Sequence, residues 1–217
     1  MAYRSSRNGI QRHMARHVKC TVTTTIRMNM IKLRSERLVL RNLEPDDLTF
    51  FMAVENDASL WNICDTRVPF SRFTLERILE ADVPDIFSRN QLRLVICKKR
   101  SGKAIGFVDF FDFSPLHRRV GMGIVVYPEK YRGRGYAEEA VHLALEYAFP
   151  AFNLHQVWAD VPAKNIPSNK LFSALGFDMC GVRPQWLCLG GKFEDVNVYH
   201  LTEDNFKKQI VKTADKQ

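Results

Sequence analysis

The stretch Tyr131-Arg132-Gly133-Arg134-Gly135-Tyr136-Ala137 decides the fold of this chain. The apolar run before it, Gly121 to Tyr127, is typical of a strand, and the segment after it, Glu138 to Phe149, has the pattern of a helix. Glycines let a backbone approach an anion closely, and the first N–H groups of a helix have no partner within it. A strand, a basic glycine-containing turn and a helix in this order predict a cradle for a phosphate or pyrophosphate.

Two common nucleotide motifs do not fit this turn. A Walker loop needs Lys and then Ser or Thr after its second glycine, whereas Tyr136 and Ala137 follow Gly135. A dinucleotide fingerprint would place a third glycine where Glu138 stands. The pattern that remains is Arg-x-x-Gly-x-Ala, from Arg132 to Ala137. The alternative is an ordinary strand–helix turn whose glycines only relieve backbone strain.

The composition is that of a globular protein with one domain. The chain has 217 residues, 46% of them hydrophobic and 26% charged. No apolar run approaches the roughly 20 residues that span a bilayer, so no membrane association is expected. The five cysteines form no CxxC pair, which favours free thiols in a reducing cytoplasm and no metal site.

The net charge of +8 belongs to the first residues. Residues 1–34 contain eight Lys or Arg and no Asp or Glu, which leaves 24 basic residues against 24 acidic ones in the rest. A neutral body argues against a nucleic-acid partner. Residues 1–31 are therefore interpreted as a basic leader that is a disordered tail, a targeting segment or the result of a mis-assigned start.

The remaining patterns predict an α/β fold in the order β-α-α-β-β-β-α-β-α-β-β, with the domain over residues 32–202 and a C-terminal tail over 203–217. One helix is expected from Glu44 to Glu55, a second from Ser71 to about Phe87, and another from Pro167 to Leu175. The strands are expected at Arg37–Arg41, Leu92–Cys97, Ala104–Phe111, Arg118–Tyr127, Gln156–Val161, Gly181–Leu189 and Phe193–Leu201.

These features resemble the GNAT superfamily of N-acetyltransferases. The Arg132–Ala137 turn is similar to the pyrophosphate loop of that family. In its second signature an Asn is followed three residues later by a Ser and then by a helix ending in Leu-Gly-Phe, as in Asn165–Phe177. Together with Leu116–Arg119, these segments resemble the branch of spermidine (diamine) and ribosomal-protein N-terminal acetyltransferases. The resemblance implies a mixed sheet of about seven strands, helices on both faces and a splayed fourth and fifth strand.

The resemblance also implies acetyl-CoA as the donor and no required metal. Its arm would lie between the splayed strands, where backbone groups hold it and an N–H near Val126 or Tyr127 polarises the thioester carbonyl. Asn165 would contact the arm and Phe172 would pack near the sulfur. The implied coenzyme-binding residues are Ile124, Val125, Val126, Arg132, Gly133, Arg134, Gly135, Tyr136, Ala137, Asn165, Ser168 and Phe172.

Two departures from the family pattern concern catalysis. Some members have a tyrosine acid where Phe172 stands, and spermidine acetyltransferases have a glutamate where Gly121 stands. The candidate bases are Asp109, Asp112 and His117. Residues i and i+3 of a strand face opposite sides, so both aspartates reach one site only if the strand bends or bulges after Asp109. Each also has a plain structural interpretation, as a solvated or ion-paired side chain.

The acceptor side is expected near the loop that follows the first helix. Glu55, Asp57, Trp61 and Asp109 are the candidate substrate-binding residues, the tryptophan through a cation–π contact. The expected reaction is acetyl transfer to a primary amine such as spermidine. A protein or peptide N-terminus as acceptor and a non-catalytic acyl-CoA-binding protein remain as alternatives. Self-association is expected by analogy with the family.

Overall fold

The computed structural model describes residues 33–61, 68–81 and 85–214, so the leader predicted for residues 1–31 lies outside it. Its elements are β1 (Leu38–Asn42), η1 (Pro45–Asp47), α1 (Leu48–Glu55), α2 (Arg72–Ala81), α3 (Ile86–Arg89), β2 (Leu92–Lys98), β3 (Ala104–Ser114), β4 (Arg119–Val126), η2 (Glu129–Tyr131), α4 (Tyr136–Ala151), β5 (Gln156–Pro162), α5 (Ile166–Ala174), β6 (Asp178–Leu189), β7 (Lys192–Thr202) and α6 (Glu203–Ala214).

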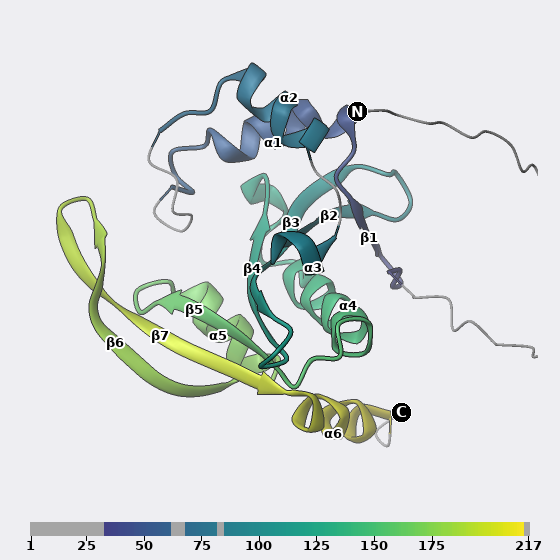
Figure 1. Cartoon of the computed structure of the whole chain (residues 1–217), viewed down its shortest axis with the longest axis vertical. Helices are drawn as coiled ribbons and strands as arrows, with labels where there is room; N and C mark the ends of the chain where they lie inside the picture. Colours follow the sequence, from purple (N-terminus) through teal and green to yellow (C-terminus); the bar gives the residue numbers. More distant parts are fainter. Residues whose placement is uncertain (1–32, 62–67, 82–84, 215–217) are drawn as a thin grey trace, which may run out of the picture. The chain divides into compact units, whose positions relative to one another are not determined.

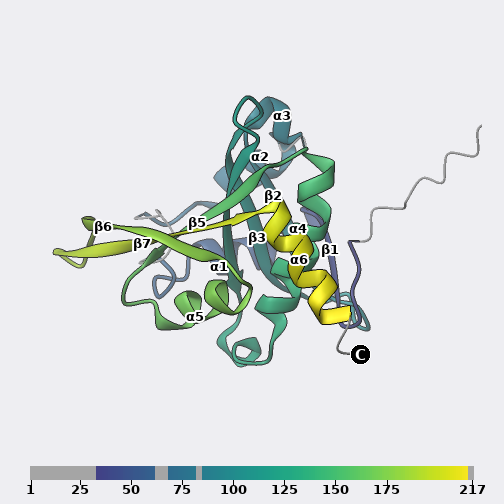
Figure 2. The ribbon, with the colours of Figure 1, turned by 90° about the horizontal axis from the view of Figure 1, so that it is seen from below.

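The strands form one mixed sheet of seven strands in the order β1-β2-β3-β4-β5-β7-β6 (Figure 1). Every neighbouring pair is antiparallel except β4 and β5, which are parallel. Figure 2 shows the β6–β7 hairpin extending away from α4 and α6. The predicted fold class is confirmed.

Successive side chains of a strand point to opposite faces of the sheet, so the protein has a hydrophobic core on each face. On one face, α4 packs through Val141, Leu145 and Phe149 against Leu40 and Phe110 of the sheet. The second core joins α1 and α2 to the other face, with these members: Leu48, Phe51, Val54, Leu60, Leu75, Val95, Cys97 and Phe107. The sheet is thus covered by helices on both faces, and α1 and α2 lie on the face that carries the acidic side chains described below.

Two segments differ from the prediction. The helix expected to run to about Phe87 is two helices, because α2 ends at Ala81 and Asp85 caps a new helix by accepting the N–H of Phe87. The segment after residue 202, treated above as a tail, contains α6. Phe206 of α6 is buried and stacks on Phe149 with a centroid distance of 5.3 Å. The buried Phe206 attaches α6 to the core beside α4.

Candidate active site

A cavity of about 1240 Å³ lies where β4 and β5 part. The two strands pair only at Arg119–Gln156, Val120–Val157 and Gly121–Trp158. Beyond Gly121, the rest of β4 lines the cavity on one side, and Asp160 to Pro162 of β5 line it on the other. The remaining walls come from β3 and Arg93 of β2, from α1 and the loop after it, from the turn before α4, from α5 and from the β6–β7 hairpin. The predicted splay of these strands is present, and it forms the site.

Alternate peptide groups of β4 face this cavity. The N–H of Tyr127 donates to the carbonyl of Ile105 at 2.9 Å, and Val126 lies opposite Gly106. Because antiparallel pairing alternates along a strand, Val125 also bonds to β3, whereas the N–H and C=O of Ile124 and Val126 point toward the β5 side. The peptide groups of Val125 and Tyr127 are thus used within the sheet, and those of Ile124 and Val126 face the cavity. Ile124, Val125 and Val126 all line the cavity, and their contact with a coenzyme stays a prediction.

The turn before α4 has the geometry of an anion site. Gly133 and Gly135 have φ angles of 68° and 76°, values that favour glycine. The first hydrogen bond of α4 joins the Glu139 N–H to the Gly135 carbonyl, so the N–H groups of the residues between them precede the helical ladder. A Cβ on Gly133 would meet nothing within 4 Å, which leaves room for a ligand at the backbone.

Two arginines of the turn are placed differently from the prediction. The N–H of Arg132 donates to the Glu129 carbonyl at 2.8 Å and is therefore not available to an anion. The Arg132 side chain lines the cavity and donates from Nε to the Val126 carbonyl at 3.0 Å. Arg134 is exposed and is not among the residues that line the cavity. Backbone groups therefore dominate the anion site, with Arg132 beside it.

A clamp of Ser35, Arg37 and Glu139 holds the turn. Arg37 donates to Glu139 at 2.5 Å and to the Arg134 carbonyl at 3.0 Å, and its guanidinium lies 4.8 Å from the Tyr136 ring centroid. Ser35 donates to Glu139 at 2.6 Å. Burial alone would raise the pKa of Glu139, but the hydrogen bonds from Ser35 and Arg37 outweigh it, and the net pKa is lowered. The segment just before β1 therefore fixes the cradle.

Helix α5 supplies Asn165, Ser168 and Phe172, and all three line the cavity. Asn165 caps the helix by accepting the Ser168 N–H at 3.2 Å, so its side-chain oxygen has a structural use. Phe172 is 3% exposed and packs on Phe177 and Tyr199, with centroid distances of 5.1 and 6.1 Å. The predicted α5 residues therefore come together on one wall.

Arg93 joins two of the predicted acidic residues, Glu55 and Asp109. Its guanidinium donates to Glu55 at 2.5 Å and to the two oxygens of Asp109 at 2.6 and 3.1 Å. Burial would lower the pKa of Arg93, but the two carboxylates raise it above its usual value. The pattern of the sequence identified both acids but not the arginine that neutralises one of their charges.

The other candidate residues differ in whether they line the cavity. Asp112 lines the cavity together with Asp109 because β3 bulges: Asp112 has φ +50°, and the β3–β4 register shifts between Phe111 and Ser114. Trp61 also lines it and donates to the Glu55 carbonyl at 2.8 Å. Asp57 lies outside the lining, and hydrogen bonds from Ser59 lower its pKa.

His117 is exposed in the β3–β4 turn and is not part of the cavity lining. That turn lies beyond the paired ends of β4 and β5, at the end of the strands opposite the opening. The geometry therefore gives no support to His117 as a base.

Several cavity residues were missed in the sequence. The ring of Phe111 meets the ring of Trp158 edge-on at 5.2 Å, and both pack over Gly121. Asp160 pairs with Arg183, whose guanidinium lies 5.2 Å from the centroid of Trp186. Alternation along the expected fifth strand could have placed Trp158 and Asp160 on one face, but their partners come from strands distant in sequence.

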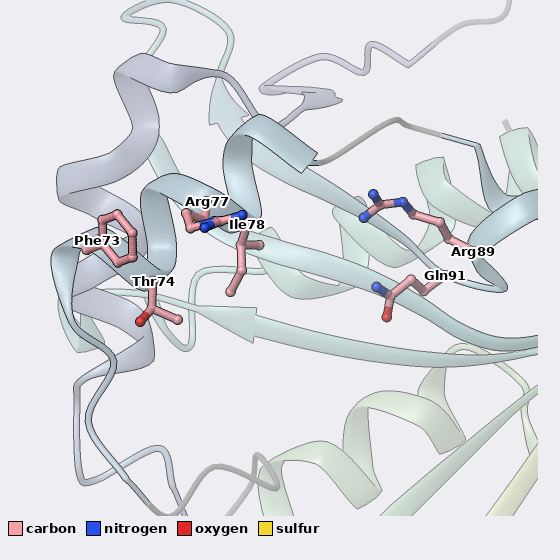
Figure 3. Close-up of a pocket in the computed structure, with 6 residues that line it drawn as sticks. All are labelled: Phe73, Thr74, Arg77, Ile78, Arg89 and Gln91. Carbon is pink, nitrogen blue, oxygen red and sulfur yellow. The ribbon is translucent and has the colours of Figure 1, made fainter.

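A second, smaller hollow of about 440 Å³ lies beside α2 (Figure 3). Its walls are side chains of α2 together with Arg89 and Gln91, which lie at the end of α3 and just before β2. None of the predicted site residues lines it.

In the described part of the chain, no three His, Cys, Asp or Glu side chains are grouped to hold a metal, and no helix has the length and apolarity to cross a bilayer.

Comparison with known proteins gives a family and a fold. A family model described as "Acetyltransferase (GNAT) domain" matches residues 37–178. A spermidine N(1)-acetyltransferase of Vibrio cholerae is 25% identical over 173 residues, which cover 79% of this chain and 96% of that protein. The Escherichia coli K12 protein of the same name is 26% identical over 163 residues, 72% of this chain and 81% of that protein.

A similar crystal structure agrees on the fold, and a further sequence relative is also described as an N-acetyltransferase. The crystal structure of the Vibrio cholerae spermidine N-acetyltransferase in complex with CoA and spermine superposes with a TM-score of 0.70 at 24% identity, covering 80% of this chain and 99% of that one. An uncharacterised N-acetyltransferase of Bacillus subtilis, YoaA, is 26% identical over 183 residues, 79% of this chain and 96% of that protein.

Proposed function

Because this chain belongs to the GNAT family of N-acetyltransferases, which transfer an acetyl group from acetyl-CoA, we propose that its acceptor is a primary amine of a polyamine such as spermidine. The observation that carries the proposal is the charge at the closed end of the splay. The described carboxylates there are Glu55, Asp109, Asp112 and Asp160. They face two guanidiniums, Arg93 and Arg183, so this end keeps an excess of negative charge.

Coenzyme A fits the opposite end of the cavity. The helix N-terminus and the open backbone at Gly133 suit a pyrophosphate. The cavity-facing peptide groups of Ile124 and the N–H of Val126, whose carbonyl already accepts from Arg132, suit an extended arm with amide groups of its own. One such N–H aimed at the thioester oxygen is worth roughly 3 kcal/mol. When bound, acetyl-CoA supplies the acetyl group as an activated thioester.

The chain's own residues then orient and deprotonate the amine. Much of the rate acceleration comes from holding the two reactants together. Phe172 has no proton to give, and none is required, because free thiols titrate near pH 8.5 and leave readily as thiolates. What the site must provide is a group that binds the cationic acceptor and takes its proton.

The test is an assay of thiol release from acetyl-CoA with spermidine, spermine and short peptides as acceptors. We expect kcat/KM for the polyamines to exceed that for peptides by about tenfold or more. Added salt should raise KM for spermidine, because it screens partly exposed charges. Equal or faster turnover of peptides would replace the polyamine proposal with N-terminal acetylation. Absence of turnover with every amine would reject both.

The clamp on the cradle gives a prediction about coenzyme affinity. Arg37→Ala removes the hydrogen bonds to Glu139 and to the Arg134 carbonyl, which hold the turn in place. Part of the binding free energy must then be used to order the turn when coenzyme A binds. We expect the Kd for coenzyme A, measured by calorimetry, to rise roughly fivefold. Arg34→Ala is the matched control, because Arg34 is exposed and, among the described residues, its side chain forms no hydrogen bond or ion pair with the turn. An equal loss in both variants would assign the effect to net charge instead.

A further inference from the structure

One of the two carboxylate oxygens of Asp160 has no hydrogen-bond partner among the described residues. Its Oδ2 is paired with Arg183, while its Oδ1 is excluded from solvent and accepts no hydrogen bond from the described residues. Native proteins rarely leave a buried polar atom in this state without a functional reason or a ligand that completes it. The Asp160 side chain as a whole is 25% exposed and lines the cavity, so a rotation of the carboxylate about its terminal bond would turn Oδ1 toward a cationic group bound there.

Asp160 also occupies a particular place on the sheet. Gly121 and Trp158 form the last pair of β4 and β5, so Gly123 and Asp160, each two residues further on, lie at the same height and on the same face. Asp109 of β3 is the partner of Gly123. A Cβ on Gly123 would approach nothing closer than 3.7 Å, so there is open room above it. Asp109 on β3 and Asp160 on β5 therefore flank Gly123, above which there is open space, near the end of the cavity where β4 and β5 pair.

The other carboxylates at this end are less suited to take a proton. Glu55 and Asp109 share the guanidinium of Arg93. Asp112 is exposed to water. For Asp160, burial raises the pKa more than the ion pair with Arg183 lowers it, and the net pKa is above the usual value. A base in a site of this kind works best with a pKa raised toward the working pH.

We propose that the carboxylate of Asp160 receives the reacting ammonium group of the acceptor and acts as its general base, with Arg183 as the positioning residue. The proposal rests on N-acetylation of an amine, as proposed above. Asp160 takes one ammonium proton, and the freed lone pair forms the C–N bond. The C–S bond breaks with its electrons on sulfur, the second nitrogen proton goes to that sulfur, and Asp160 returns its proton to solvent.

The experiment compares Asp160→Asn with Asp178→Asn, a change of the same charge at an exposed position outside the cavity. At pH 7 we expect kcat/KM for spermidine to fall about 100-fold in the first variant and to stay within twofold in the second. In Asp160→Asn the deficit should shrink as the pH rises toward the pKa of the amine, near 10, where the acceptor is already deprotonated.

Two measurements separate this role from a structural one. The Kd for coenzyme A and the Tm should be unchanged within error in Asp160→Asn, while the Kd for spermidine in the coenzyme A complex should rise about tenfold. In Arg183→Gln the loss of a positive neighbour raises the pKa of Asp160, so the acidic limb of the kcat/KM profile should move about one unit to higher pH.

The outcomes distinguish the two proposals. A wild-type protein that acetylates spermidine, with Asp160→Asn equally active and its pH profile unchanged, overturns the assignment of Asp160 alone. A wild-type protein that acetylates no amine overturns the proposed function and this assignment with it. A loss of activity in Asp160→Asn that is accompanied by an equal loss of coenzyme A affinity also overturns the assignment, because the defect is then in the fold of the cavity.

Discussion

Replacing Arg93 by methionine is expected to lower the free energy of unfolding by about 3 kcal/mol. The guanidinium pairs with Glu55 and Asp109, whose side chains are 14% and 30% exposed, and it lies 5.3 and 5.0 Å from the ring centroids of Phe51 and Phe107. Methionine keeps the contact with the rings but leaves two partly buried carboxylates without a cation. Urea unfolding of both proteins at pH 7 measures the difference.

A matched variant tests the cause of the loss. Without Arg93 the two carboxylates of Glu55 and Asp109 repel each other and are poorly solvated. The triple variant Glu55→Gln, Asp109→Asn, Arg93→Met removes both charges and should recover most of the lost stability. A deficit below about 1 kcal/mol in Arg93→Met would show that solvent already screens these pairs.

Alanine at Gly121 is expected to cost about 3 kcal/mol, whereas alanine at Gly123 changes stability by less than about 0.5 kcal/mol. Both glycines lie on β4 and both have ordinary φ angles. A Cβ at Gly121 would come within 2.4 Å of the Phe111 ring and 2.8 Å of Trp158, whereas one at Gly123 would come no closer than 3.7 Å to Phe111. The two rings also pack edge-on against each other at 5.2 Å, so neither can turn away from the new methyl group without losing that contact.

Thermal unfolding of the two alanine variants measures this contrast. Adding Phe111→Leu to Gly121→Ala should return part of the lost stability, because it removes the atoms that the new methyl group meets. Equal melting temperatures for the two single variants would contradict the packing described at Gly121.

The sequence was informative where chemistry depends on neighbouring residues. The cradle could be predicted because its glycines, its helix start and its preceding strand are contiguous in the chain, and the helix that starts at Asn165 and ends before Gly176 could be predicted for the same reason. From the sequence, the bulge that brings Asp112 beside Asp109 could be stated only as the condition under which both aspartates reach one site. A left-handed residue within a strand has no reliable signal in a single sequence.

What the sequence determined by itself is the family, the acetyl-CoA donor and the order of the strands, because these depend on local pattern and spacing. Tertiary structure alone decided how the charged side chains are arranged at the end of the cavity where β4 and β5 pair. Arg93 neutralises acids that lie 38 residues before it and 16 after it, and Arg183 reaches back 23 residues to Asp160. Whether a carboxylate is a base, an anchor or half of an ion pair depends on the charges and the burial around it. Only the folded sheet brings those groups together.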